Sequence, residues 1–312
     1  MKKSLCCVVA ILLVLLSACS QKTNSESSDS QSIALTQATE GDGLGNTVSL
    51  SEPVKTIVCS GSFAQVWTLA GGRLIGATSD FFEDSYPGTE GVGDIGSLHD
   101  PSLEQILALQ PDFIILSEDI AGHVKLKEAL VSAGIKTAYF SVETFDDYLN
   151  MLKICTDITG RKDLYAQNGE RIRADIDGII AGIKDKPSPK VLLVRAGAGK
   201  VSARSGDTMA GAMLKDMGCV NIADTNHSLL SDLSMEIIIK ENPDYIFAVA
   251  MGDEGKNRQL LEETLQSDPA WNNLSAVKNN RYILLPKDLF HQKPNNRWAE
   301  SYEYLRDVLY GR

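Results

Sequence analysis

The stretch SLEQILALQPDFII at residues 102–115 recurs without gaps as SMEIIIKENPDYIF at residues 234–247. Ser, Glu, Ile, Pro and Asp stand at equivalent positions in the two copies. Each copy predicts a short helix, a Pro-Asp turn and a buried strand, because the serine can cap the helix and the glutamate two residues later lies near its positive end. The chain therefore carries an internal duplication.

The residues around both copies continue the same alternation of strand and helix. Residues 113–116 and 245–249 are continuous apolar runs, as in parallel strands that are covered on both faces. Upstream of each copy we expect a strand, a helix and a second short strand, at residues 56–59, 63–70 and 73–76 and again at residues 191–194, 208–217 and 219–222. This alternation predicts an α/β fold of two related lobes, each with a mostly parallel sheet flanked by helices.

A long helical region separates the two halves. Residues 145–158 form an amphipathic stretch that is interrupted near Gly160, and residues 162–183 carry isoleucines at helical spacing. A helix over residues 162–183 is about 33 Å long, which is enough to bridge two lobes; a surface helix of one lobe is the alternative. We expect lobes at residues 47–160 and 187–312, joined by a bridging helix at residues 161–186.

The amino terminus carries the features of a secretory signal. Lys2 and Lys3 precede an apolar run at residues 6–16 that is too short to span a bilayer, and small residues then lead to Cys19. The tetrapeptide Leu-Ser-Ala-Cys that ends at Cys19 resembles the lipobox of bacterial lipoproteins, in which this cysteine becomes the lipidated first residue. An ordinary signal peptide with an incidental cysteine is the alternative.

These features predict a signal peptide at residues 1–18, followed at residues 19–46 by the lipidated Cys19 and a flexible polar tether. Residues 20–37 are rich in Ser, Gln, Asn and Thr, so they cannot bury enough apolar surface to offset their ordering entropy. We therefore expect a lipoprotein that is held by its acyl chains (palmitate among them) at the extracytoplasmic face of the cell membrane and does not span it.

Charge and cysteine content narrow the class of protein. The formal net charge is −11, and removal of residues 1–18, whose charged residues are two lysines, makes the chain more acidic still. An acidic chain argues against nucleic acid as a partner. Beyond Cys19, Cys59, Cys155 and Cys219 form no close pair, so we expect three buried free thiols, with one disulfide as the alternative.

The order of these motifs resembles that of the periplasmic binding proteins that serve ABC importers of iron–siderophore complexes, haem and cobalamin. The lipobox, the polar tether, the two Ser-x-Glu…Pro-Asp copies and the single helix between them carry the resemblance, which covers about residues 47–312, including stretches at residues 268–271 and 274–278. It implies a receptor, not an enzyme, that captures a small ligand between two lobes and closes only slightly around it.

The resemblance also implies partners and docking residues. In this family one exposed glutamate on each lobe docks onto arginines of an ABC permease dimer, which works with ATPase subunits, and by motif position these glutamates are Glu104 and Glu236. The alternative is that each glutamate only complements the dipole of its helix. The receptor is expected to be a monomer.

Ligands of open α/β sheets bind beyond the carboxyl ends of the strands. The loops expected there lie at residues 60–63, 80–82, 97–99, 195–197, 224–228, 251 and 288–298. From them we predict a ligand-binding set of Phe81, Phe82, Arg195, Phe290, Lys293, Arg297 and Trp298. The aromatic rings can flank a planar ligand, and the two cations at a helix start favour an anion. Packing is the alternative for Phe81, Phe82 and Trp298, and a solvated surface charge is the alternative for Arg297.

Arg195, Lys293 and Arg297 together favour an anionic ligand, which suits a ferric siderophore or haem, with no further cofactor. Cobalamin, or an oxyanion such as molybdate or tungstate, is the alternative within the same importer role. A receptor that binds zinc or manganese directly is a further alternative. It needs converging ligands, whereas the histidines lie in four separate segments, so we assign no metal-binding residues (His99, His123, His227 and His291). The chain carries no motif of a nucleophile elbow, a zinc protease or a phosphate loop, which argues against an enzyme.

Overall fold

The computed structural model describes residues 32–34, 49–51, 54–84 and 86–311. The predicted signal peptide, Cys19 and most of the predicted tether lie outside these residues. β1 (Ser32–Ala34) falls in the predicted tether and pairs antiparallel with β2 (Ser49–Ser51), which falls in the predicted first lobe. In the described part of the chain, no helix combines the length and the apolar character that a membrane span needs.

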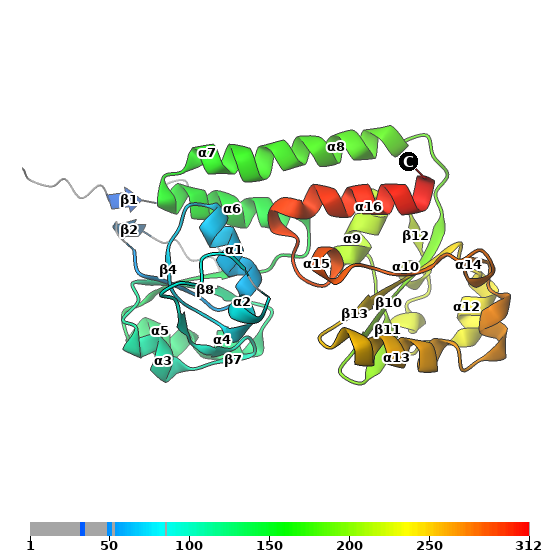
Figure 1. The fold of residues 1–312 in the computed structure, drawn as a ribbon, viewed down its shortest axis with the longest axis horizontal. Coiled ribbons are helices and arrows are strands. Elements are labelled where there is room, and N and C mark those ends of the chain that lie inside the picture. Colours follow the sequence, from blue (N-terminus) through cyan, green and yellow to red (C-terminus); the bar gives the residue numbers. More distant parts are fainter. Residues whose placement is uncertain (1–31, 35–48, 52–53, 85, 312) are drawn as a thin grey trace, which may run out of the picture. The chain divides into compact units, whose positions relative to one another are not determined.

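The first lobe is built on a five-stranded parallel sheet with the order β5–β4–β3–β8–β9. These strands are β3 (Thr56–Val58), β4 (Leu74–Ala77), β5 (Gly93–Asp94), β8 (Phe113–Ser117) and β9 (Lys136–Phe140). Every residue of β3 and β8 is buried, as expected of parallel strands with both faces covered. The helices are α1 (Gly61–Leu69), α2 (Ser79–Glu83), α3 (Leu103–Ala108), α4 (Ala121–Lys125), α5 (Lys127–Ser132) and α6 (Phe145–Thr159), and β6 (Gly96–Ser97) and β7 (Asp100–Pro101) form a short hairpin (Figure 1).

The second lobe repeats this plan. Its sheet has the order β11–β10–β13–β14, with β12 also on β10, and all pairs are parallel except β10–β11. The strands are β10 (Lys190–Gly197), β11 (Lys200–Ala203), β12 (Val220–Asn221), β13 (Tyr245–Ala250) and β14 (Tyr282–Leu284). The helices are α9 (Met209–Asp216), α10 (Ile222–Thr225), α11 (Ser228–Ser231), α12 (Met235–Glu241), α13 (Glu254–Leu265), α14 (Ser275–Lys278), α15 (Lys287–Phe290) and α16 (Trp298–Tyr310), with 3₁₀ turns at Pro269–Asn273 and Asn295–Arg297. The predicted two-lobed α/β fold is confirmed.

The repeated motif has the same local structure in both lobes. Ser102 and Ser234 cap α3 and α12, each accepting a hydrogen bond from the third N–H of its helix, at 3.3 and 3.4 Å. The carboxylates of Asp112 and Asp244 each accept a backbone N–H at the start of the neighbouring strand, at 3.0 and 2.9 Å. The Pro-Asp turn therefore ties the strand that follows it to the first strand of its sheet.

The predicted helix over residues 162–183 is present, but it contains a wider turn. It runs as α7 (Lys162–Tyr165), a π-helical turn (Ala166–Glu170) and α8 (Arg171–Ile183). Asn168 lies buried in this turn, where its side chain donates to the carbonyl of Leu69 at 3.0 Å and its own carbonyl accepts the hydroxyl of Tyr148 at 2.8 Å. The π turn thus fixes the start of the helix to the first lobe.

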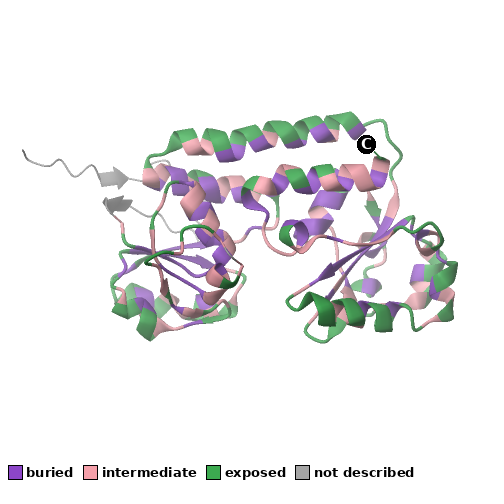
Figure 2. Ribbon diagram, viewed as in Figure 1, coloured by how far each residue is buried: buried purple, intermediate pink, exposed green. Residues whose placement is uncertain are grey.

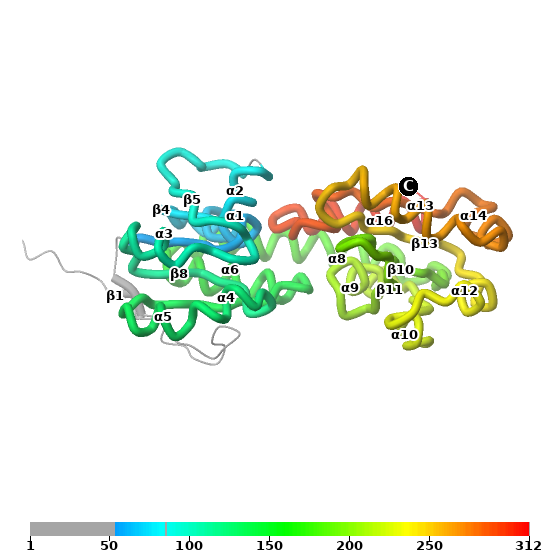
Figure 3. The backbone as a smooth tube through the Cα atoms, turned by 90° about the horizontal axis from the view of Figure 1, so that it is seen from below, coloured from blue at the N-terminus to red at the C-terminus, as the bar shows by residue number. Residues whose placement is uncertain are grey.

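One hydrophobic core runs through both lobes. It joins Val58 and Ile115 of the first sheet with Val191 and Phe247 of the second through side chains of α6, α8 and α16. The apolar face predicted for α8 is buried in it, and the outer face of each sheet has a smaller core of its own. Figure 2 shows α8 and α16 side by side, each with buried residues along it, and Figure 3 follows the chain from the blue and cyan first lobe to the yellow and orange second lobe.

The three cysteines of the described chain are free thiols. Cys59 and Cys155 are buried, whereas Cys219 is half-buried. Burial raises the pKa of all three, so they stay protonated at neutral pH.

Candidate functional site

A cavity of about 470 Å³ opens at the carboxyl ends of β10 and β13 in the second lobe. This is where parallel α/β sheets bind their ligands, because the loops after the strands converge there. Its walls come from β10, the start of α9, the end of β13 and the segment after α15. The lining residues are Glu143, Leu193, Arg195, Arg204, Ser205, Asp207, Thr208, Met209, Ala210, Val249, Met251, Phe290, His291 and Lys293.

Arg195 and Arg204 are cations of this cavity that form no ion pair with a described residue, and Asp207, which also lines it, forms none either. Arg195 lies within β10, which runs three residues further than the sequence predicted, and Arg204 directly follows β11. The antiparallel ladder pairs Arg195 with Ser202, so Arg204, two residues later, lies on the same face. Neither guanidinium forms an ion pair with any described residue. Burial, with the charge of Arg204, lowers the pKa of Arg195, and the Nε of Arg204 is buried without an acceptor.

Lys293 also lines the cavity, and it forms an ion pair. Its ammonium donates to Oε1 of Glu143 at 2.9 Å. Oε2 of Glu143 accepts the backbone N–H of Met209, the first residue of α9, at 3.0 Å. Glu143 comes from the loop between β9 and α6 of the first lobe, so one carboxylate from that lobe lies in the wall of a cavity in the other.

The remaining predicted ligand residues have other environments. Phe290 lines the cavity but is 3% exposed and packs against Tyr304. Phe81 is fully buried in the first lobe between Phe82, which is half-buried, and Tyr86. These contacts favour the packing alternative for Phe81.

Trp298 and Arg297 do not line the cavity. Trp298 is fully buried, with its ring edge against Phe145 of the first lobe. Arg297 makes ion pairs with Asp288 and Glu300, both at 2.8 Å. Arg297 is therefore neutralised by the protein's own carboxylates, and the anion site predicted beside it is not left open.

Sequence reasoning missed Arg204 and Glu143. A signal for Arg204 was present: a turn at residues 197–199 between two strand-like segments implies a hairpin, and its register places Arg204 diagonally beside Arg195. No local signal marks Glu143, because its partners lie 66 and 150 residues further along the chain.

The histidines do not gather into a metal site. Nδ1 of the buried His123 accepts the backbone N–H of Ser117 at 2.9 Å, and Nε2 contacts the carbonyl of Leu98 at 2.7 Å. His291 lines the cavity, where burial lowers its pKa and keeps the ring neutral. Within the described residues, no three His, Cys, Asp or Glu side chains are placed to hold a metal ion.

The predicted docking glutamates lie on exposed faces of equivalent helices. Glu104 is in the first turn of α3 and Glu236 in the first turn of α12, and both are exposed. One turn after each glutamate stands an exposed apolar residue, Leu107 at 43% and Ile239 at 38%. Both lobes therefore present the same pair of an acidic and an apolar side chain.

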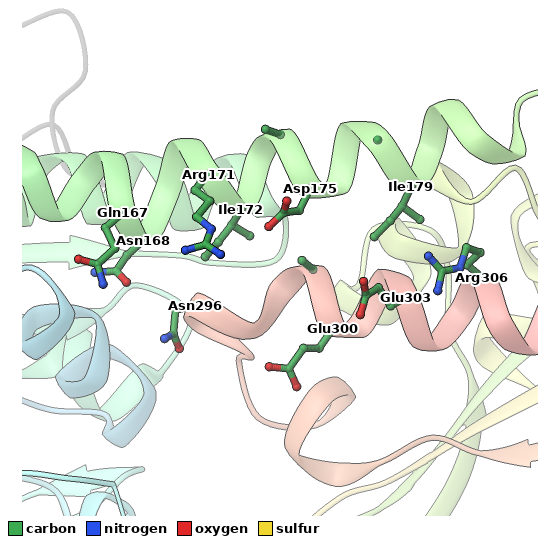
Figure 4. Close-up of a pocket in the computed structure, with 13 residues that line it drawn as sticks. Gln167, Asn168, Arg171, Ile172, Asp175, Ile179, Asn296, Glu300, Glu303 and Arg306 are labelled. Atoms are coloured by element: carbon green, nitrogen blue, oxygen red, sulfur yellow. The ribbon is translucent and has the colours of Figure 1, made fainter. Parts of the chain in front are cut away.

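A second hollow, of about 630 Å³, lies between α8 and α16 (Figure 4). Arg171 and Asp175 of α8 line it together with Glu303 and Arg306 of α16. Its charges are of both signs, and none of its lining side chains has a buried polar atom without a partner. We interpret it as the crease between two packed helices.

Comparison with known proteins agrees with this architecture. Residues 80–289 match the family model described as "Periplasmic binding protein". The petrobactin-binding protein YclQ of Bacillus subtilis (strain 168) is 28% identical over 91% of each chain, and the Fe(3+)-citrate-binding protein YfmC of the same organism is 25% identical over 97% of this chain and 96% of its own.

Solved structures share the fold at lower identity. An ABC transporter substrate-binding protein from Listeria monocytogenes EGD-e superposes with a TM-score of 0.69 at 20% identity, covering 83% of this chain and 99% of its own. S. aureus IsdE complexed with heme superposes with a TM-score of 0.70 at 16% identity, covering 82% and 99%. The family resemblance predicted from the sequence is confirmed: the chain belongs to the periplasmic binding protein family.

Proposed function

We propose that this chain is the substrate-binding component of an ABC importer and that its cargo is an anionic ferric chelate. The observation that carries the proposal is the pair Arg195 and Arg204, two partly buried cations that face one cavity without a carboxylate partner. Desolvated cations without partners are costly, and an anionic ligand offsets that cost with charge-assisted hydrogen bonds. The names of the relatives, which bind petrobactin and Fe(3+)-citrate, support iron as the metal.

The walls of the cavity favour a hydrophilic chelate over a flat macrocycle such as haem. Phe290 is the one Phe, Tyr or Trp among the cavity's lining residues in the described chain, and its ring is almost fully covered. Trp298 and Phe81, which the sequence offered as stacking surfaces, are buried. Carboxylate or hydroxamate oxygens suit the arginines better than a porphyrin face does.

We further propose that the protein acts outside the cytoplasmic membrane, anchored through Cys19. The lipobox at Cys19 supports this anchor, as does the name of one relative, a putative ABC transporter substrate-binding lipoprotein YhfQ, which is 23% identical over 89% of each chain. In this arrangement the receptor is a monomer that docks on its permease through Glu104 and Glu236. The exposed Leu107 and Ile239 beside them add apolar contact area to a charged interface.

Calorimetric titration of the purified protein with ferric citrate tests the cargo. We expect binding that Arg195→Met and Arg204→Met each weaken by about 10- to 100-fold, because a hydrogen bond to a charged group contributes about 1.5–3 kcal/mol. Arg171→Met removes the same charge from the crease between α8 and α16 and serves as the matched control, with affinity unchanged. Tight binding of haem with no response to ferric citrate, or full affinity in both cavity variants, would contradict the proposal.

A further inference from the structure

Glu143 joins the two lobes at the wall of the cavity. Its backbone belongs to the first lobe, whereas both partners of its carboxylate belong to the second. These partners are the ammonium of Lys293, at 2.9 Å, and the N–H of Met209, at 3.0 Å. The side chain of Glu143 is 42% exposed and that of Lys293 is 21% exposed. The contact therefore lies at the edge of the cavity, where solvent reaches the carboxylate more easily than the ammonium.

The groups that hold Glu143 are those that would bind an anionic ligand. A lysine ammonium and the first free N–H of a helix are both favourable to negative charge. Arg195 and Arg204 line the same cavity and have no carboxylate of their own. The charge of Glu143 acts on Arg195 and raises its pKa, against the larger effect of burial. Glu143 and Asp207 are the two carboxylates among the lining residues, and Glu143 is the one that pairs with a cation of the cavity, Lys293.

We propose that Glu143 is an internal counter-anion of the ligand site, and that an anionic group of the chelate displaces it from Lys293 and from the start of α9. The inference rests on the proposed function. An anion bound between Arg195 and Arg204 would repel the carboxylate of Glu143. Lys293 and the N–H of Met209 would attract that anion. The side chain of Glu143 is 42% exposed, so its carboxylate can turn to solvent when it leaves Lys293. Ligand binding then exchanges a contact between the lobes for a contact with the ligand.

Titration of four proteins with ferric citrate tests the exchange. Glu143→Gln removes the competing charge and is expected to bind up to about fivefold more tightly than the wild type, the range that the loss of one weak ion pair allows. Lys293→Met is expected to bind ferric citrate more weakly than the wild type, because the variant lacks the ammonium that leaves Glu143 and pairs with the ligand. Glu241→Gln is the matched control: it also removes an acid paired with a lysine, Lys190 at 3.1 Å, but lies away from the cavity. Thermal unfolding of each variant checks that it is folded.

The outcomes separate this inference from the proposed function. Tighter binding by Glu143→Gln together with weaker binding by Lys293→Met supports displacement. Tighter binding by Glu143→Gln with unchanged affinity in Lys293→Met means that Glu143 stays on Lys293, which overturns the inference. Unchanged or weaker binding by Glu143→Gln, or an equal gain in Glu241→Gln, overturns it as well. If the wild type binds no ferric chelate at all, the proposed function fails and the displacement fails with it.

Discussion

His123 is a buried histidine whose two ring nitrogens are both engaged by backbone groups. Nδ1 accepts the N–H of Ser117, so this nitrogen cannot carry a proton without losing that hydrogen bond. Burial lowers the pKa of His123 below its ordinary value of 6.5, although the hydrogen bond to the Leu98 carbonyl and the charge of Asp80 act in the opposite direction. The imidazole is therefore a neutral structural group of the first lobe.

The lowered pKa of His123 predicts a loss of stability in mild acid. The unfolded chain binds the proton more readily than the folded one, so the stabilising contribution is complete above pH 6.5 and falls as the pH drops below it. We expect the free energy of unfolding in urea to decline between pH 7.5 and pH 5.5 more steeply in the wild type than in His123→Gln. His227→Gln, at an exposed position, is the control and should keep the wild-type slope. Equal slopes in all three proteins would contradict this role of His123.

Residue by residue, the sequence predicted best where the chemistry is local. Arg195 was predicted to follow a buried strand and lies within β10, and both Arg195 and Lys293 line the cavity. Phe81 and Trp298 were predicted as ligand contacts because they lie in loops expected beyond the carboxyl ends of the strands, yet tertiary packing covers both. Arg297 forms ion pairs with Glu300, three residues later, and with Asp288. The prediction considered the positive charges of this segment without the carboxylates that could neutralise them. The contacts of Glu143 with Met209 and Lys293 depend on the fold, and no local sequence pattern indicates them.

At the scale of elements, one face of α8 is buried in the core and the other is exposed to solvent. Ile172, Ile176, Ile179 and Ile183 are buried, while Gly178 lies on the exposed side. A methyl group added at Gly178 or at Gly182 would meet no heavy atom within 4 Å. These glycines therefore leave the helix with more conformational freedom than its packing requires.

Gly178→Ala and Gly182→Ala are expected to raise the free energy of unfolding by up to about 1 kcal/mol each, because alanine has the higher helix propensity and no contact opposes it. Gly211→Ala is the matched control inside α9, where the new methyl would lie 2.0 Å from the carbonyl oxygen of Ser205. That variant should lose stability. Urea denaturation measures all three, and destabilisation by Gly178→Ala would contradict the exposed, regular helix described here.

The sequence predicted the order of elements and the bridging helix, but not the π turn. Apolar spacing reports which face is buried, and that spacing is correct from Ile172 onward. The π turn depends on Asn168 bonding to Leu69, which lies 99 residues earlier in the chain. Periodicity cannot report a contact at that separation. The duplication, by contrast, was visible because the same residues recur in the sequence, and each copy makes its own capping hydrogen bond between residues three apart.

At the scale of the whole molecule, the sites proposed for binding and for docking lie in different parts of the two lobes. The proposed ligand cavity lies at the carboxyl ends of β10 and β13, and the glutamates proposed for docking lie on α3 and α12. The core that runs from the first sheet to the second through α6, α8 and α16 is one packed cluster. Packed cores resist deformation, which favours a small closing motion over a wide hinge.

Uptake of radiolabelled ferric citrate by iron-starved cells that lack the native gene tests the importer role most directly. The wild-type protein should restore uptake, and Arg195→Met with Arg204→Met should fail because it no longer holds the chelate. Glu104→Gln with Glu236→Gln should keep its affinity in titration yet lower uptake at least tenfold, as expected when charged contacts to a partner are lost. Glu128→Gln with Glu262→Gln, which changes one exposed glutamate on each lobe elsewhere, should transport normally. Full uptake with the docking variant, or uptake that does not depend on this chain, would contradict the account.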